Sequence, residues 1–366
     1  MVLVVCSSVF QLYVSVVLKK TLLRDKKVDL ILTDATPAFN ELAQNEELCK
    51  LFNSVKQVKV SANINKLNRL QKSKYGQMFF ELFPNRYAKK IWKINAKKYD
   101  ECYFSSYTTP NVFLQYAVKK KNKKTKIHLY EDGISTYLVR NNQRIRSPKF
   151  IGRIFKVRRI EELVDDVLLF EPNLMCLSEY KNIVQIPKPF EVEGVIESLN
   201  SIFAKTDYSI KENFVFFEES FNNDGYITND VDLINKVYEL CEGKDFILKH
   251  HPRNRIDRFK TILPTLDAPI FWEAYLHDHN VDDKVLVTVS SNTVFVPHLL
   301  HGCKPTVVML YKIFNGTSPI LGSGNFENYI DKYLKLYDSY TNAKFYIPET
   351  VEEFEQIIKK LKKEEK

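Results

Sequence analysis

The chain has 366 residues, of which 45% are hydrophobic and 27% charged, and its formal net charge is +9. This balance is typical of a globular chain of roughly two domains and excludes an intrinsically disordered one. Its six cysteines are scattered without a CxxC pair, which favours reduced thiols in the cytoplasm over a disulfide framework. No apolar run is long enough to predict a membrane-spanning helix.

In the first half of the chain, short apolar runs predict strands that alternate with helices. The predicted strands are Val2–Cys6, Val28–Thr33, Gln57–Val60, Glu101–Ser105 and Lys126–Tyr130. Helices are predicted near Val9–Leu23, Ala38–Asn45, Asn63–Phe83 and the lysine-rich segment Arg86–Lys98. The opening residues are apolar, but no basic segment precedes them and no small-residue cleavage site follows. We therefore expect a strand, a turn and a helix there rather than a signal peptide.

The same alternation restarts in the second half after a proline-containing segment, Pro187–Asp207, which is the predicted linker. The predicted strands are Phe214–Phe217, Phe246–Lys249, Lys284–Val289 and Thr306–Leu310. Helices are predicted over Asn229–Cys241, Asn292–His301 and an amphipathic Val351–Lys363, whose apolar face carries Phe354, Ile357, Ile358 and Leu361. The pattern predicts an α/β protein with two Rossmann-like domains, residues 1–200 and 201–366, whose strand ends face a central cleft.

An acidic pair and a glycine follow the fifth predicted strand, as Glu131-Asp132-Gly133. The glycine allows a sharp turn at the strand end. Two adjacent carboxylates point in opposite directions, so one of them can reach a cleft and act as a general base toward a hydroxyl. An acidic turn without catalytic function is the alternative interpretation.

The segment His250-His251-Pro252-Arg253 follows the second predicted strand of the later domain. Pro252 restricts the backbone beside His251, whose imidazole can donate to a phosphate oxygen and protonate a leaving group. Arg253 can bind phosphate or carboxylate through two parallel hydrogen bonds. A histidine that only caps the strand end, with a surface arginine beside it, is the alternative.

Three further groups in the later domain are candidates. Ser290-Ser291 lies between a strand and a helix start, where backbone N–H groups favour an anion, although serine is also a common N-cap. Glu218-Glu219 follows the strand Phe214–Phe217 and is a second candidate for the base. Glu273 lies among aromatic residues and is either a ligand for a ribose diol or an ordinary residue of a helix start.

Taken in chain order, the acidic pair before glycine, the His-Pro and the serine pair at a strand end resemble the bacterial sialyltransferases. The similarity is greatest to glycosyltransferase family 52, the lipooligosaccharide and capsule sialyltransferases. The opening strand and helix, including Gln11, also resemble that family. The resemblance implies a GT-B fold, CMP-sialic acid as donor, inversion at the anomeric carbon, and neither a metal nor a further cofactor.

The resemblance also implies roles for individual residues. His251 would contact the CMP phosphate and act as an acid toward it, Ser290 and Ser291 would bind the same phosphate, and Glu273 would hold the ribose. The whole donor-binding set expected from motifs and resemblance is His251, Pro252, Arg253, Glu273, Ser290, Ser291 and Gly133. The candidate catalytic carboxylates are Asp132, ranked first as the base, then Glu218 or Glu219, and Glu131 as the neighbour of Asp132.

The expected reaction moves sialic acid to a hydroxyl of a terminal sugar, galactose in an α-2,3 linkage, on a lipooligosaccharide or capsule. The expected partners are a lipid-linked glycan and an anionic membrane surface, which the lysine-rich terminal helix would touch at the inner face of the bacterial plasma membrane. A second copy of the chain, in a homodimer, is a further candidate partner, and nucleic acid is not expected as a partner. The alternatives are a polysialyltransferase, another GT-B nucleotide-sugar transferase, and a basic nucleic-acid-binding α/β protein.

Overall fold

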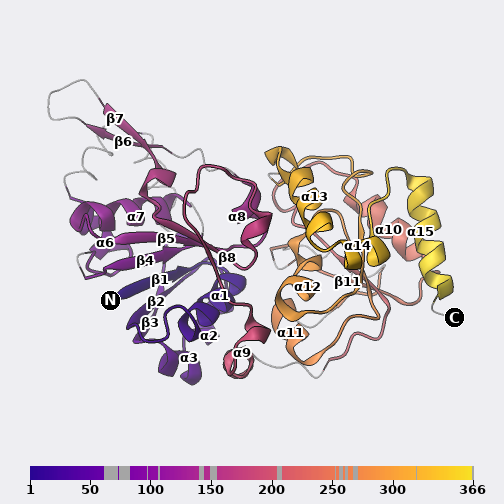
Figure 1. The fold of residues 1–366 in the computed structure, drawn as a ribbon, viewed down its shortest axis with the longest axis horizontal. Coiled ribbons are helices and arrows are strands. Elements are labelled where there is room, and N and C mark those ends of the chain that lie inside the picture. The colour runs from indigo at the N-terminus through magenta and orange to yellow at the C-terminus, as the bar shows by residue number, and fades with distance from the viewer. Residues whose placement is uncertain are drawn as a thin grey trace. The chain divides into compact units, whose positions relative to one another are not determined.

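The chain divides into two compact units, Met1–Phe203 and Ala204–Lys366, and each is built on a parallel sheet flanked by helices (Figure 1). The computed structural model describes residues 1–61, 73, 83–96, 98–105, 108–139, 144–148, 155–203, 208–251, 253–254, 259, 263–266, 271–318 and 320–364. Within these residues, every helix is too short or too polar to span a bilayer.

The first unit contains a seven-stranded parallel sheet in the order β3-β2-β1-β4-β5-β8-β9. The strands are β1 Val2–Cys6, β2 Val28–Thr33, β3 Ser54–Val58, β4 Glu101–Phe104, β5 Lys126–Tyr130, β8 Asp166–Leu169 and β9 Ile183–Gln185. Every residue of β1 and β2 is buried, which agrees with their largely apolar sequences. Strand order reverses between β1 and β4, and ligands of open α/β sheets bind at the carboxyl ends of strands beside such a reversal.

Helices and 3₁₀ turns connect the strands of the first unit. They are α1 Val9–Lys20, α2 Phe39–Leu42, α3 Glu46–Leu51, α6 Pro84–Ile91, α7 Thr109–Lys121, α8 Ser135–Leu138, η1 Ile160–Leu163, η2 Pro172–Leu174, η3 Pro189–Glu191 and α9 Val195–Ile202. A separate antiparallel hairpin pairs β6 Arg144–Pro148 with β7 Phe155–Arg159. The side chain of Ser8 caps α1 by accepting the N–H of Gln11 at 3.2 Å, which fixes where this helix begins.

The second unit has a five-stranded parallel sheet in the order β11-β10-β12-β13-β14. Its strands are β10 Phe214–Phe217, β11 Phe246–Lys249, β12 Val285–Thr288, β13 Thr306–Met309 and β14 Phe345–Tyr346. Its helices and 3₁₀ turns are α10 Asp230–Leu240, α11 Trp272–Asp278, η4 Asn292–Val294, α12 Val296–His301, η5 Leu321–Ser323, α13 Phe326–Leu336, α14 Asp338–Lys344 and α15 Val351–Glu364. Strand order reverses between β10 and β12, so the residues that follow these strands occupy the favoured ligand position.

The predicted amphipathic terminal helix is confirmed as α15, which packs beside α10 (Figure 1). Its apolar face belongs to the core of the second unit, because Phe354 and Ile358 are fully buried and Leu361 is 6% exposed. This face is therefore occupied by the core and is not available to insert into a lipid surface.

Replacing Phe354 by alanine should destabilise the second unit by about 3–5 kcal/mol, because the change leaves a cavity among the buried side chains of the sheet, α10 and α15. Urea unfolding measures the loss. The exposed Gln356 on the same helix provides a control, since its replacement by alanine should change the free energy of unfolding little. Equal effects of the two substitutions would contradict the packing of α15.

The predicted linker contains the division between the two units, at Phe203 and Ala204, but much of it is folded. The segment Pro187–Asp207 contains η3 and α9, and α9 packs against α1 with Val195, Leu199 and Ile202 buried. The part of the segment that the structure describes is therefore folded onto the first unit.

Other predicted elements differ from the structure in extent. The predicted helix Ala38–Asn45 is the short helix α2, with α3 starting just after it, and the predicted helix Asn292–His301 is η4 followed by α12. The predicted helix Asn63–Phe83 lies almost wholly outside the described residues. Strands β8, β9 and β14 and the hairpin of β6 and β7 were not predicted.

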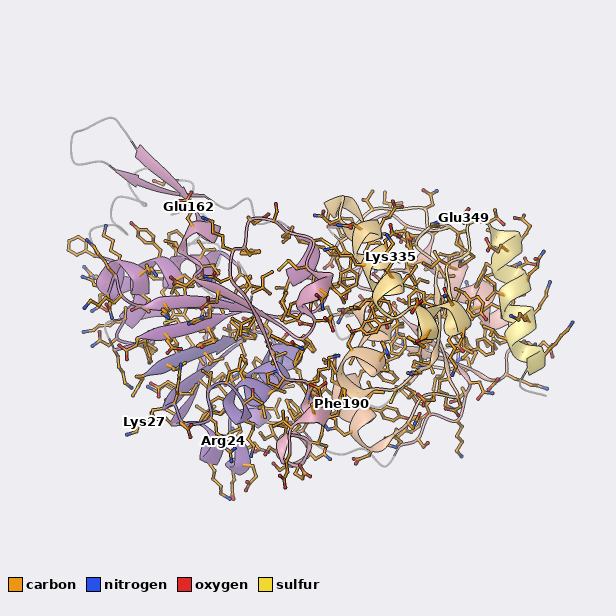
Figure 2. The ribbon with its side chains drawn as sticks, viewed as in Figure 1. Arg24, Lys27, Glu162, Phe190, Lys335 and Glu349 are labelled. Atoms are coloured by element: carbon orange, nitrogen blue, oxygen red, sulfur yellow. The ribbon has the colours of Figure 1, made fainter. Side chains whose placement is uncertain are left out.

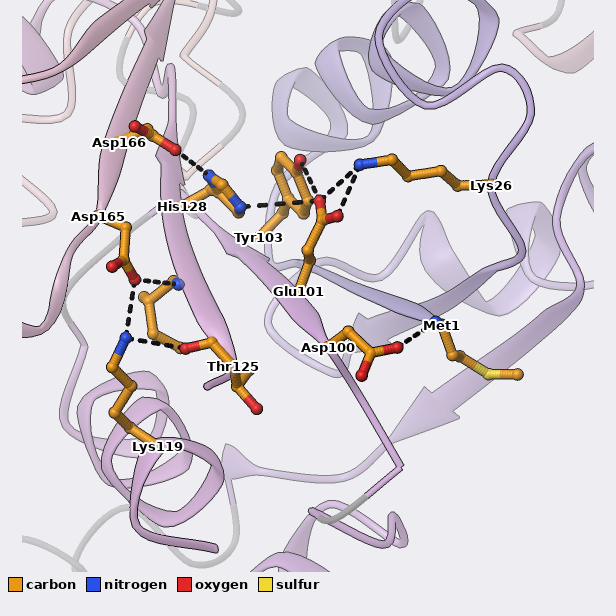
Figure 3. A network of polar contacts seen from close by, with 11 residues as sticks. Met1, Lys26, Asp100, Glu101, Tyr103, Lys119, Thr125, His128, Asp165 and Asp166 are labelled. Atoms are coloured by element: carbon orange, nitrogen blue, oxygen red, sulfur yellow. Dashed lines mark hydrogen bonds and ion pairs between the residues drawn. The ribbon is translucent and has the colours of Figure 1, made fainter. Parts of the chain in front are cut away.

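Near the amino-terminal edge of the first sheet, a network of charged groups surrounds His128 (Figure 3). The imidazole of His128 lies 3.0 Å from Asp166 and 3.7 Å from Glu101, and its ring stacks on Tyr103. Lys26 forms an ion pair with Glu101 at 2.6 Å. These contacts join β4, β5 and β8, so the network stabilises the edge opposite to the strand ends that carry the predicted site.

Candidate functional site

The predicted site residues of the first unit lie in the turn that follows β5. Gly133 has a φ of +65°, a conformation that glycine adopts without strain, and α8 begins two residues later. The half-buried Asp132 is held through its backbone, whose N–H donates to Thr136 Oγ1 at 2.8 Å and whose carbonyl accepts from Ser135 Oγ at 3.0 Å. The turn therefore fixes the backbone of Asp132 independently of its side-chain contacts.

The carboxylate of Asp132 also contacts α1, which follows β1. Gln11 Nε2 donates to Asp132 Oδ2 at 2.9 Å, and Gln11 Oε1 accepts the N–H of Ser7 at 2.5 Å. Gln11 and Asp132 are 121 positions apart in the sequence. Their contact brings together the ends of β1 and β5, which lie on either side of β4 and beside the reversal in strand order.

Glu131 points into the interior of the first unit and is 5% exposed. Its Oε2 accepts from Tyr137 Oη at 2.5 Å and from the N–H of Phe170 at 2.8 Å. Burial raises the pKa of Glu131 to about 7, although these two hydrogen bonds oppose the shift. Its contacts join the turn after β5 to the end of β8, an interior role that does not suit a catalytic carboxylate.

In the second unit, Glu218 joins the ends of the adjacent strands β10 and β11. Its side chain is fully buried, and Oε2 lies 2.9 Å from His250 Nδ1 and 3.4 Å from the N–H of His251. The backbone N–H of Glu218 also donates to the carbonyl of Lys249 at 3.0 Å. Glu218 therefore positions the two histidines and does not present an exposed base.

His251 is half-buried, and its Nδ1 accepts the backbone N–H of Arg253 at 3.1 Å. An acceptor at Nδ1 places the proton of the neutral imidazole on Nε2, which is then a hydrogen-bond donor. Burial lowers the pKa of His251 to about 4, and the positive charges of Arg253 and Lys249 act in the same direction. At neutral pH, His251 therefore offers a neutral N–H beside two cationic side chains.

Arg253 is exposed and is already partly oriented by the loop that follows β10. Its guanidinium donates to Ser220 Oγ at 2.6 Å and contacts Asp224 Oδ1 at 3.3 Å. Pro252 lies outside the described residues. The two contacts hold the guanidinium near the ends of β10 and β11, where an anion could replace or share them.

Glu219 and Ser290 join the ends of β10 and β12. Ser290 is fully buried, and its N–H and Oγ donate to Oε1 and Oε2 of Glu219, at 2.5 and 2.8 Å. The predicted role of Ser290 as a phosphate ligand does not suit this placement, because both of its donors are used within the protein. The predicted role of Glu219 as an alternative base is disfavoured for the same reason, since both of its oxygens accept from Ser290.

Burial raises the pKa of Glu219 to about 7 from an ordinary 4.5, against the effect of these bonds. The contribution of this shift to stability is therefore present below about pH 4.5 and is lost as the pH rises through 7. Replacing Ser290 by alanine should cost about 1–3 kcal/mol, and more at high pH, because the ionised carboxylate then loses the hydroxyl donor to Oε2 and keeps only donors to Oε1. Urea unfolding at mildly acidic and mildly alkaline pH measures the difference. An equal loss under both conditions would contradict this assignment.

Ser291 is half-buried and precedes η4. Its Oγ lies 2.9 Å from Thr293 Oγ1 and accepts the N–H of Thr293 at 3.3 Å, so it acts as an N-cap. Trp272 Nε1 donates to the carbonyl of Thr293 at 3.1 Å and holds α11 beside this turn. Ser291 is therefore the serine of the pair that an anion at the strand ends could contact.

Glu273 lies in the first turn of α11, and burial raises its pKa to about 7, with the positive charge of Lys249 opposing the shift. Burial in turn lowers the pKa of Lys249, the last residue of β11. Glu273 therefore interacts electrostatically with a half-buried lysine, and it lies at a helix start as the alternative interpretation predicts. Its role as a ribose ligand stays a prediction. Lys249 is a candidate anion-binding residue that the sequence interpretation missed, although a lysine that ends an apolar strand is a visible signal.

The two groups of strand-end residues differ in what they can do chemically. The second unit gathers a neutral imidazole N–H, an arginine and a half-buried lysine at the carboxyl end of β11, a combination that suits a phosphate. The first unit presents a carboxylate held by a neutral amide, which suits proton abstraction. His250, Lys249 and Gln11 were not among the predicted site residues, because their contacts come from distant segments.

A family model described as alpha-2,8-polysialyltransferase (POLYST) matches residues 2–311. No curated protein matches the chain. Among solved structures, the chain is similar to the glycotransferase of kitacinnamycin (9% identity, 98% of this chain and 90% of that chain, TM-score 0.53). It is also similar to UDP-N-acetylglucosamine 2-epimerase from Rickettsia bellii (14% identity, 84% of this chain and 78% of that chain, TM-score 0.50). A third similar structure is an alpha/beta-galactoside alpha-2,3-sialyltransferase from Photobacterium phosphoreum (13% identity, 92% of this chain and 95% of that chain, TM-score 0.46).

At these identities, the similarities to solved structures concern the fold alone. Together with the two parallel sheets, the similarity to the glycotransferase confirms the predicted α/β fold of the GT-B type. The matched family confirms the broader prediction of a sialyltransferase, whereas membership of family 52 in particular is not confirmed.

Proposed function

The chain belongs to the alpha-2,8-polysialyltransferase family, and we propose that it transfers sialic acid from CMP-sialic acid to a hydroxyl of an acceptor glycan, with inversion at the anomeric carbon. The observation that carries the donor assignment is the group of His251, Arg253 and Lys249 at the carboxyl end of β11, the edge strand that pairs with β10. The family match, which covers most of the chain, supports sialic acid as the transferred group.

On the donor side, the bond between the anomeric carbon and the phosphate oxygen breaks, and CMP leaves with the electron pair. Negative charge then grows on the phosphate. The Nε2–H of His251 donates to this phosphate, and Arg253 and Lys249 stabilise its charge. A pKa of about 4 keeps His251 neutral before the donor binds, and a bound phosphate would raise that pKa and favour proton donation.

On the acceptor side, Asp132 takes the proton of the attacking hydroxyl while the hydroxyl oxygen bonds to the anomeric carbon. One base on the acceptor and one leaving group on the donor give a single displacement, and therefore inversion. Asp132 is preferred over the other predicted carboxylates because it is half-buried, whereas Glu131 and Glu218 are buried and both oxygens of Glu219 accept from Ser290.

For the acceptor, we propose a terminal sialic acid of an oligosialyl chain, extended through an α-2,8 linkage. The matched family supports this acceptor over galactose and the α-2,3 linkage. The net charge of +9 also favours it, since each sialic acid of such a chain carries a carboxylate. A capsule or lipooligosaccharide would carry this acceptor in a bacterium.

A donor screen tests the proposed function. The protein is incubated with an oligosialyl acceptor, or with lactose, and with CMP-sialic acid, a UDP-sugar or a GDP-sugar, with EDTA present throughout. Release of CMP with extension of the oligosialyl acceptor is the expected result. Extension of lactose would instead favour the α-2,3 reaction. Release of UDP or GDP, or loss of turnover in EDTA, would contradict the proposal.

We also propose that the protein associates peripherally with the anionic inner face of the plasma membrane, through surface charge. Exposed basic side chains such as Arg24 and Lys27 project from the first unit (Figure 2). Lys359 and Lys363 are exposed on α15. The apolar face of α15 packs in the core, so only the lysines of this helix can make its predicted contact with the membrane surface. Partitioning to anionic vesicles should therefore fall steeply with salt.

A further inference from the structure

We propose that Gln11 is a positioning residue for Asp132: its side-chain amide holds the carboxylate in the orientation that accepts the proton of the acceptor. This inference rests on the proposed role of Asp132 as the base. Gln11 lies in the first turn of α1, is 3% exposed and reaches Asp132 from a different strand end.

The orientation of the Gln11 amide is determined by its partners. Oε1 accepts the N–H of Ser7 at 2.5 Å, so the amino group must point the other way, toward Asp132 Oδ2 at 2.9 Å. Ser7 is itself fixed, because its carbonyl accepts from Thr36 Oγ1 at 2.8 Å. A buried glutamine is uncommon, and here both ends of its amide bind groups at the edge of the sheet where the proposed base lies.

The chemistry of the amide suits a base. A lysine or arginine at this position would favour the ionised carboxylate so strongly that it would take up a proton poorly. A neutral donor orients the carboxylate while favouring its ionised form less than a cation would. Holding a reacting group in its productive orientation contributes to catalysis apart from its proton affinity.

Other groups around Asp132 are identified by their contacts and electrostatic interactions. Ser135 and Thr136 bind its backbone, and the interior groups that interact with its charge are Cys6, Tyr130 and Glu131. Burial raises the pKa of Cys6 to about 12 and that of Tyr130 well above its ordinary value, so both stay neutral at neutral pH. Glu131, whose pKa is about 7, is the neighbour among these that titrates in the working range.

The isosteric variant Q11E tests the inference. One carboxylate oxygen of the altered side chain can still accept from Ser7, while the other faces Asp132 and places two negative charges together. The protonated form of the pair is then favoured, so the acid limb of the kcat/KM profile should move to higher pH by about one unit or more. The control Q11M removes the donor without adding charge. It should lower kcat by about tenfold or more, while the acid limb of the kcat/KM profile stays at the same pH as in the wild type.

Calorimetry with CMP separates this inference from the proposed function, because the residues proposed to bind CMP belong to the second unit. CMP affinity should be the same in wild type, Q11E and Q11M. An unmoved acid limb in Q11E, together with full kcat in Q11M, would overturn the role of Gln11. Full activity of the Asp132→Asn variant would instead reject Asp132 as the base. Thermal melting tests whether each variant folds. If Q11E does not fold, the kcat of Q11M alone tests the role of Gln11, and full kcat in Q11M would then overturn it.

Discussion

Replacing His251 by alanine is expected to lower kcat with CMP-sialic acid by about 10²–10³-fold, the cost of losing one hydrogen bond to a charge that develops in the transition state. The imidazole is oriented by the N–H of Arg253 at Nδ1, so that Nε2–H faces away from that bond and can meet a phosphate. Steady-state turnover of CMP-sialic acid measures the effect. The fold should persist, because the ring is only half-buried and its hydrogen bond to Arg253 lies within the same loop.

Two comparisons make the result specific. His251→Gln keeps a side-chain donor and should recover part of the lost rate, whereas a purely structural role would give no such difference. His279, which contacts the carbonyl of Tyr275 in the same unit, provides a matched histidine-to-alanine control with near-normal turnover. Near-normal turnover in His251→Ala would remove this residue from the mechanism.

Replacing Asp132 by asparagine is expected to lower kcat by about 10²–10⁴-fold, because the amide cannot take the proton of the acceptor hydroxyl. The size of the side chain and its backbone contacts are kept, so the melting temperature should change little. Turnover with an oligosialyl acceptor measures the loss. Asp100→Asn, at the opposite edge of the first sheet, is a control that should leave turnover unchanged.

If Asp132→Asn kept its turnover, another base would be needed. The remaining predicted carboxylates are poor replacements, because Glu131 is held by Tyr137 and Phe170, and Glu219 by Ser290. The base would then have to be sought outside the residues singled out from the sequence.

The strands that carry the site could be predicted from the sequence. Lys126–Tyr130, Phe214–Phe217 and Phe246–Lys249 are short, largely apolar runs followed by polar residues, and the structure forms β5, β10 and β11 over the same residues. Burial on both faces of a parallel sheet produces such runs, so the signal is strong and local. The strand ends, and therefore the candidate residues, follow directly.

The direction in which a side chain points could not be predicted. Ser290 was expected to face a phosphate, but its partner Glu219 lies 71 residues earlier in the chain, and a contact between them depends on strand order. The same holds for Gln11 and Asp132, which are 121 residues apart. Sequence spacing contains no information on such pairs, because neighbouring strands of a sheet need not be neighbours in the chain.

The linker prediction placed the division between the two units correctly but missed the folded part of the segment, for a related reason. Two prolines suggested an open connection, but Pro189 occupies the first position of η3, where its missing N–H costs nothing. The following helix α9 is short, and it is stabilised by burying Leu199 and its apolar neighbours against α1 rather than by its own propensity. Tertiary packing of this kind has no signature within a short window of sequence.

The central claim is that residues at the strand ends of the second unit bind the CMP phosphate, while Asp132 takes the proton of the acceptor hydroxyl. Calorimetric titration of CMP into wild type, His251→Ala and Asp132→Asn tests it most directly. Wild type and Asp132→Asn should bind CMP equally, and His251→Ala should bind it about 10–100-fold more weakly, as expected for a lost hydrogen bond to a charged group. Failure of the wild type to bind CMP, or equal affinity in His251→Ala, would contradict the claim.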